Sequence, residues 1–181
     1  MTTLPFFTIG HSTHSLEEFA ALLRESGVQR VVDIRKMPGS RKFPQFNEDA
    51  LARGLPPLGV HYEHVAALGG LRGKTPEVPA SANAWWENES FHRYADYACT
   101  PAFAEGLAHL IEIGHRERCA LMCSEVLWWR CHRRIVTDHL LARGEVVWHI
   151  MGPGKVEAAH LSEGAVVGEG GAVRYPAITA A

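Results

Sequence analysis

Apolar and polar positions along the chain fall into two alternating patterns. Short apolar runs predict buried strands at residues 6–9, 30–34, 60–64, 119–122 and 145–150. Apolar residues at helical spacing predict helices that begin after Ser15, Asn47 and Thr100, and further helices over residues 91–98 and 135–141. Strands and helices therefore follow one another in turn.

Strands that alternate with helices pair in parallel through right-handed crossovers. We therefore predict an α/β fold: an open, mostly parallel sheet of about five strands with helices on both faces, in a single domain. The α/β domain is expected over residues 1–150, with residues 66–90 as an inserted irregular loop. Residues 151–181 form a C-terminal tail, which is either a hairpin or a poorly ordered end.

Composition adds limits to this picture. The chain has 181 residues, 46% hydrophobic content and a formal net charge of -2, which suits one soluble domain. No run approaches the roughly 20 apolar residues of a membrane span, and the N-terminus lacks the regions of a secretory signal, so we expect a cytoplasmic protein without a membrane partner. In that compartment the four cysteines stay reduced, which favours metal binding, catalysis or burial over disulfides.

Reactive side chains follow the predicted strands at their carboxyl ends, where parallel sheets bind ligands. The candidate catalytic residues at this edge are His11, Asp33, Cys123, Glu125 and His132. Ser12 and Tyr62 occupy similar positions and are candidates for substrate binding. A single polar residue at a strand end is usually a turn or capping residue, so the grouping of these residues carries the prediction.

Half of the 18 basic residues lie on loops at this edge or beyond Cys123. They are Arg35, Lys36, Arg41, Lys42, Arg72, Lys74, Arg130, Arg133 and Arg134. Guanidinium groups bind phosphate and carboxylate, so an anionic ligand is indicated, with Arg35, Arg41, Arg130 and Arg133 as candidate anion-binding residues directed toward the rim. The alternative is that these arginines pair with acidic neighbours such as Asp33 and Glu125.

Three interpretations of Cys123 remain open. A helix start and nearby arginines would stabilise a nucleophilic thiolate, although Trp129 stands where the phosphatase loop has its arginine. Cys123 could bind a metal with Cys131 and His132, or it could be a buried structural thiol. His132 is close enough in sequence to reach Cys123 or Glu125, whereas the spacing of Cys131 from Ile135 predicts an inward-facing, structural residue on the helix.

Several separated motifs resemble one protein family. They are Thr8-Ile9-Gly10-His11-Ser12, Asp33-Ile34-Arg35 with Pro38 and Ser40, Tyr62 with Leu68-Gly69-Gly70, Tyr94-Ala95, Met122-Cys123-Ser124-Glu125, and Cys131-His132-Arg133-Arg134. Together, over about residues 8–150, they resemble the bacterial family known as domain of unknown function 488. The resemblance implies a compact α/β domain and a shared site, but no defined reaction. It adds Ser40, Gly69 and Gly70 to the candidate substrate-binding residues.

The function we predict is that of an enzyme acting on an anionic, phosphate-bearing or nucleotide-like substrate at the carboxyl edge of the sheet. The expected partner is a small anionic or nucleotide-like ligand, and no cofactor is expected. One alternative is a binding module for a nucleotide or nucleic acid, in which Trp85 and Trp86, expected to be exposed, stack on bases. Another is a metal-binding protein that uses Cys123, Cys131 and His132. The sequence does not indicate an oligomeric state.

Overall fold

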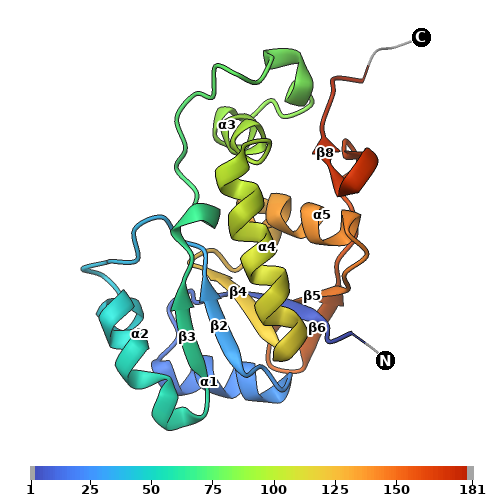
Figure 1. Ribbon diagram of the computed structural model, residues 1–181. Coiled ribbons are helices and arrows are strands. Elements are labelled where there is room, and N and C mark those ends of the chain that lie inside the picture. Colours follow the sequence, from blue (N-terminus) through green and yellow to red (C-terminus); the bar gives the residue numbers. More distant parts are fainter. Residues whose placement is uncertain (1–2, 179–181) are drawn as a thin grey trace.

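Six strands form a central sheet in the computed structural model, which describes residues 3–178 (Figure 1). The strands are β1 (Phe6–Gly10), β2 (Arg30–Asp33), β3 (His61–His64), β4 (Cys119–Cys123), β5 (Val147–Gly152) and β6 (Lys155–Ala158). Their order is β3-β2-β4-β1-β5-β6. The first five strands are parallel and β6 is antiparallel to β5, so the predicted open, mostly parallel sheet is confirmed. Strand β6 lies in the C-terminal tail, beyond the strands predicted from the sequence.

The helices begin close to the predicted positions. They are α1 (Leu16–Glu25), α2 (Glu48–Gly54), α3 (Glu89–Tyr97), α4 (Pro101–Arg116) and α5 (Arg133–Ala142). Ser15 caps α1 in a capping box with Glu18, and Thr100 caps α4. Asn47 precedes α2 without a side-chain cap, because its Oδ1 accepts a hydrogen bond from the Ser40 N–H at 2.7 Å.

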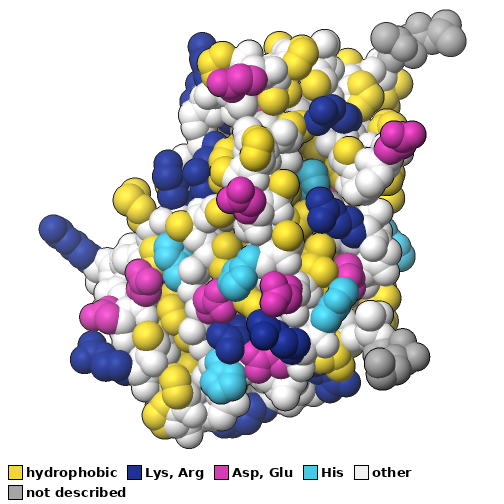
Figure 2. All heavy atoms as spheres, viewed as in Figure 1, with side chains coloured by type: hydrophobic (Ala, Val, Ile, Leu, Met, Phe, Trp, Pro, Cys, Tyr) yellow, Lys and Arg dark blue, Asp and Glu magenta, His cyan; other side chains and the backbone are white. Residues whose placement is uncertain are grey.

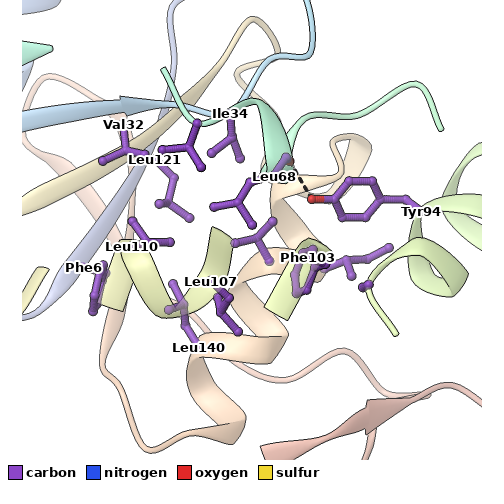
Figure 3. Close-up of a cluster of buried hydrophobic side chains, with 14 of the residues drawn as sticks. Phe6, Val32, Ile34, Leu68, Tyr94, Phe103, Leu107, Leu110, Leu121 and Leu140 are labelled. Carbon is purple, nitrogen blue, oxygen red and sulfur yellow. Dashed lines mark hydrogen bonds between the residues drawn. The ribbon is translucent and has the colours of Figure 1, made fainter. Parts of the chain in front are cut away.

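Two apolar clusters cover the two faces of the sheet, because successive side chains of a strand point to opposite sides. One cluster joins α1 and α2 to the sheet through residues such as Phe19, Leu51 and Val31. The other joins α4 and α5 to the opposite face, where Leu107 and Leu140 are fully buried (Figure 3). The prediction of helices on both faces is confirmed.

The segment over residues 66–90 is irregular but contains short helical turns at Ala66–Leu68 and Ala80–Asn83. The prediction that Trp85 and Trp86 are exposed is wrong. Trp86 is only 6% exposed and belongs to the apolar cluster that joins α4 and α5 to the sheet. Trp85 packs against Trp86 and Tyr175. These rings fill the gap between the segment and the tail, so their apolar surface is used inside the protein.

Part of the C-terminal tail packs against α5. The strands β7 (Val166–Val167) and β8 (Val173–Arg174) pair antiparallel, and Tyr175 beyond them is fully buried. The Tyr175 hydroxyl donates to Asp138 of α5 at 2.7 Å, and the same carboxylate accepts the Ser162 N–H at 2.9 Å. Two tail groups therefore satisfy one buried carboxylate.

Charged and histidine side chains are intermixed over the face that carries α4 (Figure 2). Arg30 pairs with both Glu63 and Glu117, and Glu63 also accepts a hydrogen bond from His109. Arg30 and His109 on this face thus have acidic partners. Between residues 3 and 178, none of the helices has the length and apolar character needed to cross a bilayer.

We expect Tyr175→Phe to lower the free energy of unfolding by about 1–3 kcal/mol, because it removes one hydrogen bond to the buried Asp138 carboxylate. Urea denaturation monitored by circular dichroism measures the change. Val167→Thr, on the exposed side of the hairpin, is the control and should stay within about 0.5 kcal/mol of the parent chain. Equal stability of the Tyr175→Phe variant and the parent would contradict this account of the tail.

Candidate active site

A cavity of about 700 Å³ lies where β1 and β4 end side by side. After β1 the chain enters α1 on one face of the sheet, and after β4 it leads to α5 on the other face. The two loops therefore separate above adjacent strands, which is where open α/β sheets form binding crevices. Residues 36–43 and the start of α3 complete the wall.

More than half of the predicted site residues line this cavity. They are His11, Arg35, Ser40, Gly70, Cys123, Glu125, Arg130 and His132. The remaining candidates, Ser12, Asp33, Arg41, Tyr62, Gly69 and Arg133, do not line it. The spatial grouping expected at the carboxyl edge of the sheet is therefore present, with fewer direct contributors than the sequence suggested.

Two thiols meet at the base of the cavity. Cys123 ends β4, Cys131 lies just before α5, and their Sγ atoms are 2.8 Å apart. Cys131 is not on the inward face of the helix as predicted, because Trp128–Arg130 form a separate 3₁₀ turn and α5 begins only at Arg133. The prediction that put Cys131 on the helix is therefore wrong, and Cys131 instead lies before the helix and lines the cavity.

The Arg133 side chain binds Cys123 and the loop that joins it to Cys131. This side chain is completely buried, so the prediction that it is directed toward the rim is wrong. The guanidinium donates to Cys123 Sγ at 2.6 Å, to the Val126 carbonyl at 2.8 Å, to Thr8 Oγ1 at 3.2 Å and to the Glu125 carbonyl. A buried guanidinium is tolerated only when its donors are satisfied, and here sulfur and backbone oxygens satisfy them.

The first proton of the buried thiol pair has a lowered pKa. Burial favours the neutral thiol, but the hydrogen bond with Cys123 and the charge of Arg133 together lower the pKa of Cys131 to about 7. Burial, and then the neighbouring Cys131, raise the pKa of Cys123 well above its usual range. One proton is therefore shared between the sulfurs, and the negative charge of the pair lies beside Arg133.

His132 is oriented toward this pair. Its Nε2 donates to the Ile34 carbonyl at 2.7 Å, which leaves Nδ1 as the acceptor, 3.5 Å from Cys131 Sγ. Burial lowers the pKa of His132, so the neutral ring is favoured. The ring fits because residue 70 is glycine, where a Cβ would lie 3.0 Å from Nδ1. His132 was expected to reach Cys123 or Glu125, but its side-chain hydrogen bond is with Cys131.

His11 and Arg35 form the opposite wall. His11 Nδ1 donates to the Ser12 carbonyl at 2.8 Å, its ring stacks on Phe46, and Nε2 lies 3.5 Å from Arg35 Nη1. Burial lowers the pKa of His11. Asp33 is fully buried behind this wall and binds the Arg35 guanidinium at 2.7 and 2.9 Å, so this carboxylate fixes the position of Arg35 in the cavity wall.

Only three of the nine basic residues considered in the sequence analysis line the cavity: Arg35, Lys36 and Arg130. Arg72 lies over the Tyr97 ring and donates to the Gly69 carbonyl, and Arg134 donates to Ser162 Oγ. Several of the others are therefore used within the fold. The cavity is less basic than the count of arginines and lysines along the sequence implied.

The structure adds residues from segments distant in sequence. The lining residues outside the candidate set include Met37, Phe43, Leu71, Asn88, Ser90, Phe91 and Tyr94. Asn88 caps α3 by accepting the Phe91 N–H, and the Tyr94 ring lies 4.9 Å from the His132 ring. The start of α3 was recognisable in the sequence, but its position beside α5 depends on the packing of α4.

One family matches most of the chain. The family described as Domain of unknown function DUF488 matches residues 15–140. The chain belongs to this family. No curated protein and no solved structure matches the chain significantly. Membership in DUF488 agrees with the resemblance seen in the sequence motifs and leaves the reaction to be inferred from the site.

A second feature of the site concerns metals. Within residues 3–178, histidine, cysteine, aspartate and glutamate side chains form no group of three or more that could hold a metal ion. Cys123, Cys131 and His132 are instead joined to one another and to Arg133 and the Ile34 carbonyl.

We expect Gly10→Ala to destabilise the protein by about 1–3 kcal/mol or more, because an added Cβ would lie 2.0 Å from the Glu125 carbonyl oxygen. This oxygen also accepts from Arg133, so the change should disturb the thiol pair as well. Urea denaturation tests the first effect. Gly39→Ala is the matched control, since no atom lies within 4 Å of the place that its added methyl group would occupy, and little loss is expected.

We expect the rate of Cys131 alkylation by iodoacetamide to rise with pH through a midpoint of about 7, because the thiolate is the reactive form. Cys123→Ala should move this midpoint upward by removing the neighbouring thiol. Peptide mass spectrometry resolves each cysteine. Cys119→Ser is the control and should leave the midpoint unchanged, and a midpoint near 9.0 in the parent protein would contradict the assigned environment.

Proposed function

We propose that this DUF488 protein is an enzyme that uses Cys131 as a nucleophile on an anionic, phosphate-bearing or nucleotide-like substrate. The observation that carries the proposal is the contact of Cys131 Sγ with His132 Nδ1 and Cys123 Sγ at the base of an open cavity. A thiol with a hydrogen-bonded imidazole is one of the arrangements that activate a cysteine for covalent catalysis. A cytoplasmic location, where thiols stay reduced, is part of the proposal.

The residues around Cys131 can take up its proton and stabilise its thiolate. The neutral His132 Nδ1 accepts a hydrogen bond from the Cys131 thiol and is placed to take its proton when the thiol reacts, while its Nε2–H remains bound to the Ile34 carbonyl. The Arg133 N–H lies 3.5 Å from Cys131 Sγ at the start of α5, and the Arg133 guanidinium stabilises charge on the pair through Cys123. Cys123 then acts as a hydrogen-bond partner for the nucleophile.

The walls of the cavity suit an anion with an attached flat or apolar group. Arg35, Lys36 and Arg130 offer cationic groups for the anion. Phe43 and Phe91 offer apolar surface for the rest of the substrate. A volume of about 700 Å³ is within the usual range for small-molecule sites and is large enough for a nucleotide.

His11 is the second acid-base group of the proposal. It lines the cavity, and its Nδ1–H is held by the Ser12 carbonyl, so Nε2 can exchange a proton with a leaving group or with water. Glu125 also lines the cavity, where its Oε1 accepts the Leu127 N–H at 3.1 Å. That bond fixes the loop that carries the Glu125 carbonyl toward Arg133.

A test begins with turnover of nucleoside mono-, di- and triphosphates and of p-nitrophenyl phosphate, followed by phosphorus NMR. We expect turnover of at least one of them, and Cys131→Ser should lower its rate by at least about a thousandfold while the compound still binds. Cys119→Ser, which changes a buried thiol at the other end of β4, is the control. Turnover that survives Cys131→Ser would overturn the proposal.

Arg130→Ala should weaken binding of the same compound about tenfold, because one charged hydrogen bond is lost. Arg41→Ala is the matched control, since Arg41 is exposed and does not line the cavity. Isothermal titration calorimetry measures both affinities. Binding of a nucleotide without turnover, unaffected by Cys131→Ser, would favour the alternative of a binding module.

A further inference from the structure

The thiol pair has a second chemical property that does not depend on the substrate. Cys123 Sγ and Cys131 Sγ are in contact at 2.8 Å, yet both cysteines are free thiols. The two residues are eight positions apart in sequence and are carried by different elements, the end of β4 and the turn before α5. A small shift of the turn is therefore enough to bring the sulfurs into bonding distance.

The other two cysteines of the chain lie away from this pair. Cys119 is at the start of β4, about 13 Å from Cys123 at the usual strand rise, and its thiol donates to the Glu117 carbonyl. Cys99 lies just beyond the end of α3, where it contacts Asn83 and Arg174. Among the four cysteines, all within residues 3–178, Cys123 and Cys131 are the two that touch.

The cavity gives a small oxidant access to this pair. Cys123 and Cys131 both line the cavity, although they are only 3% and 7% exposed. The Arg133 guanidinium and the Arg133 N–H favour the thiolate form, which is the form that reacts with peroxides. Cys131 has the greater exposure and the contact with His132, so it is the sulfur that reacts first.

We infer that Cys123 and Cys131 form a reversible disulfide when the protein meets a hydroperoxide, with Cys131 as the peroxide-reactive thiol and Cys123 as the resolving thiol. The formation of the disulfide follows from the sulfur contact and the cavity alone. Its consequence for turnover rests on the proposed function, because the disulfide would consume the nucleophile. The protein would then be inactive under oxidising conditions and active again after reduction by a dithiol.

The reaction balances in two steps. Cys131 transfers its proton to His132, and the thiolate attacks the terminal oxygen of the hydroperoxide, so an S–O bond forms and the O–O bond breaks. The departing alkoxide takes the proton from His132 and leaves as an alcohol, or as water from hydrogen peroxide. Cys123 then attacks the sulfenic sulfur, the S–O bond breaks, and the hydroxide leaves with the Cys123 proton as water. The thiols lose two electrons and the hydroperoxide gains them.

Disulfide formation would also change the surroundings of Arg133. In the reduced protein the guanidinium donates to Cys123 Sγ, and a shared negative charge on the pair compensates its own charge. A disulfide sulfur carries no charge, so this compensation disappears on oxidation. The reduced pair is thereby stabilised relative to the disulfide, which makes the disulfide easy to reverse.

The test treats the full chain with hydrogen peroxide, blocks the remaining thiols with N-ethylmaleimide and maps the peptides by mass spectrometry. We expect a Cys123–Cys131 cross-link that dithiothreitol removes, formed at least about tenfold faster than any oxidation of Cys99 or Cys119. Cys123→Ser should instead accumulate a sulfenic acid at Cys131 that dimedone traps. Cys119→Ser is the matched control and should form the cross-link at the parental rate.

The inference is overturned if peroxide oxidises Cys131 to the sulfinic acid in the parent protein without a cross-link, or if Cys99 reacts faster than Cys131. Circular dichroism confirms that each variant is folded, and the parental protein alone is sufficient for the decisive measurement. The readout needs no substrate. A cross-link in a protein whose turnover survives Cys131→Ser would contradict the proposed function and leave this inference standing, while turnover that depends on Cys131 without a cross-link would do the reverse.

Discussion

The buried guanidinium of Arg133 is the interaction on which the site depends. It comes from the first turn of α5 and reaches back under the end of β4, where it binds Cys123 Sγ and the carbonyls of Glu125 and Val126. A charge in this position is costly unless every donor has an acceptor, so the loop that follows β4 is fixed in the one shape that offers them. That shape holds Cys131 against Cys123 and directs His132 toward Cys131.

A polar layer beneath the site supports this arrangement. Thr8 of β1 accepts from Arg133 and donates to His149 of β5 at 2.6 Å, so adjacent strands are linked under the thiol pair. The His149 ring stacks on Trp128, whose turn precedes Cys131. Burial, together with the charge of Arg133, lowers the pKa of His149 to about 3, which keeps this ring neutral beside the guanidinium. The base of the cavity is therefore rigid, while its rim consists of loops.

Redox chemistry and catalysis, as proposed, use the same property of this site. A thiolate stabilised in a low-dielectric environment is a good nucleophile toward a substrate, and it is equally reactive toward a peroxide. In these proposals, the neighbouring Cys123 keeps the thiolate hydrogen-bonded during catalysis and limits its oxidation to a reversible step. Two free thiols in contact at the base of a cavity therefore suit a protein that alternates between an active and a protected state.

The sequence alone determined the α/β fold, the capped starts of α1 and α4, and the edge of the sheet at which the site lies, because these depend on local periodicity and on the rule that parallel strands end together. Tertiary structure decided where Cys131 and Arg133 lie. Their positions depend on where α5 begins, and helix boundaries are set by packing and by the 3₁₀ turn at Trp128–Arg130 rather than by residue pattern. Tertiary structure also decided that Trp86 and Tyr175 are buried, because their partners are distant in sequence and no local pattern reveals them.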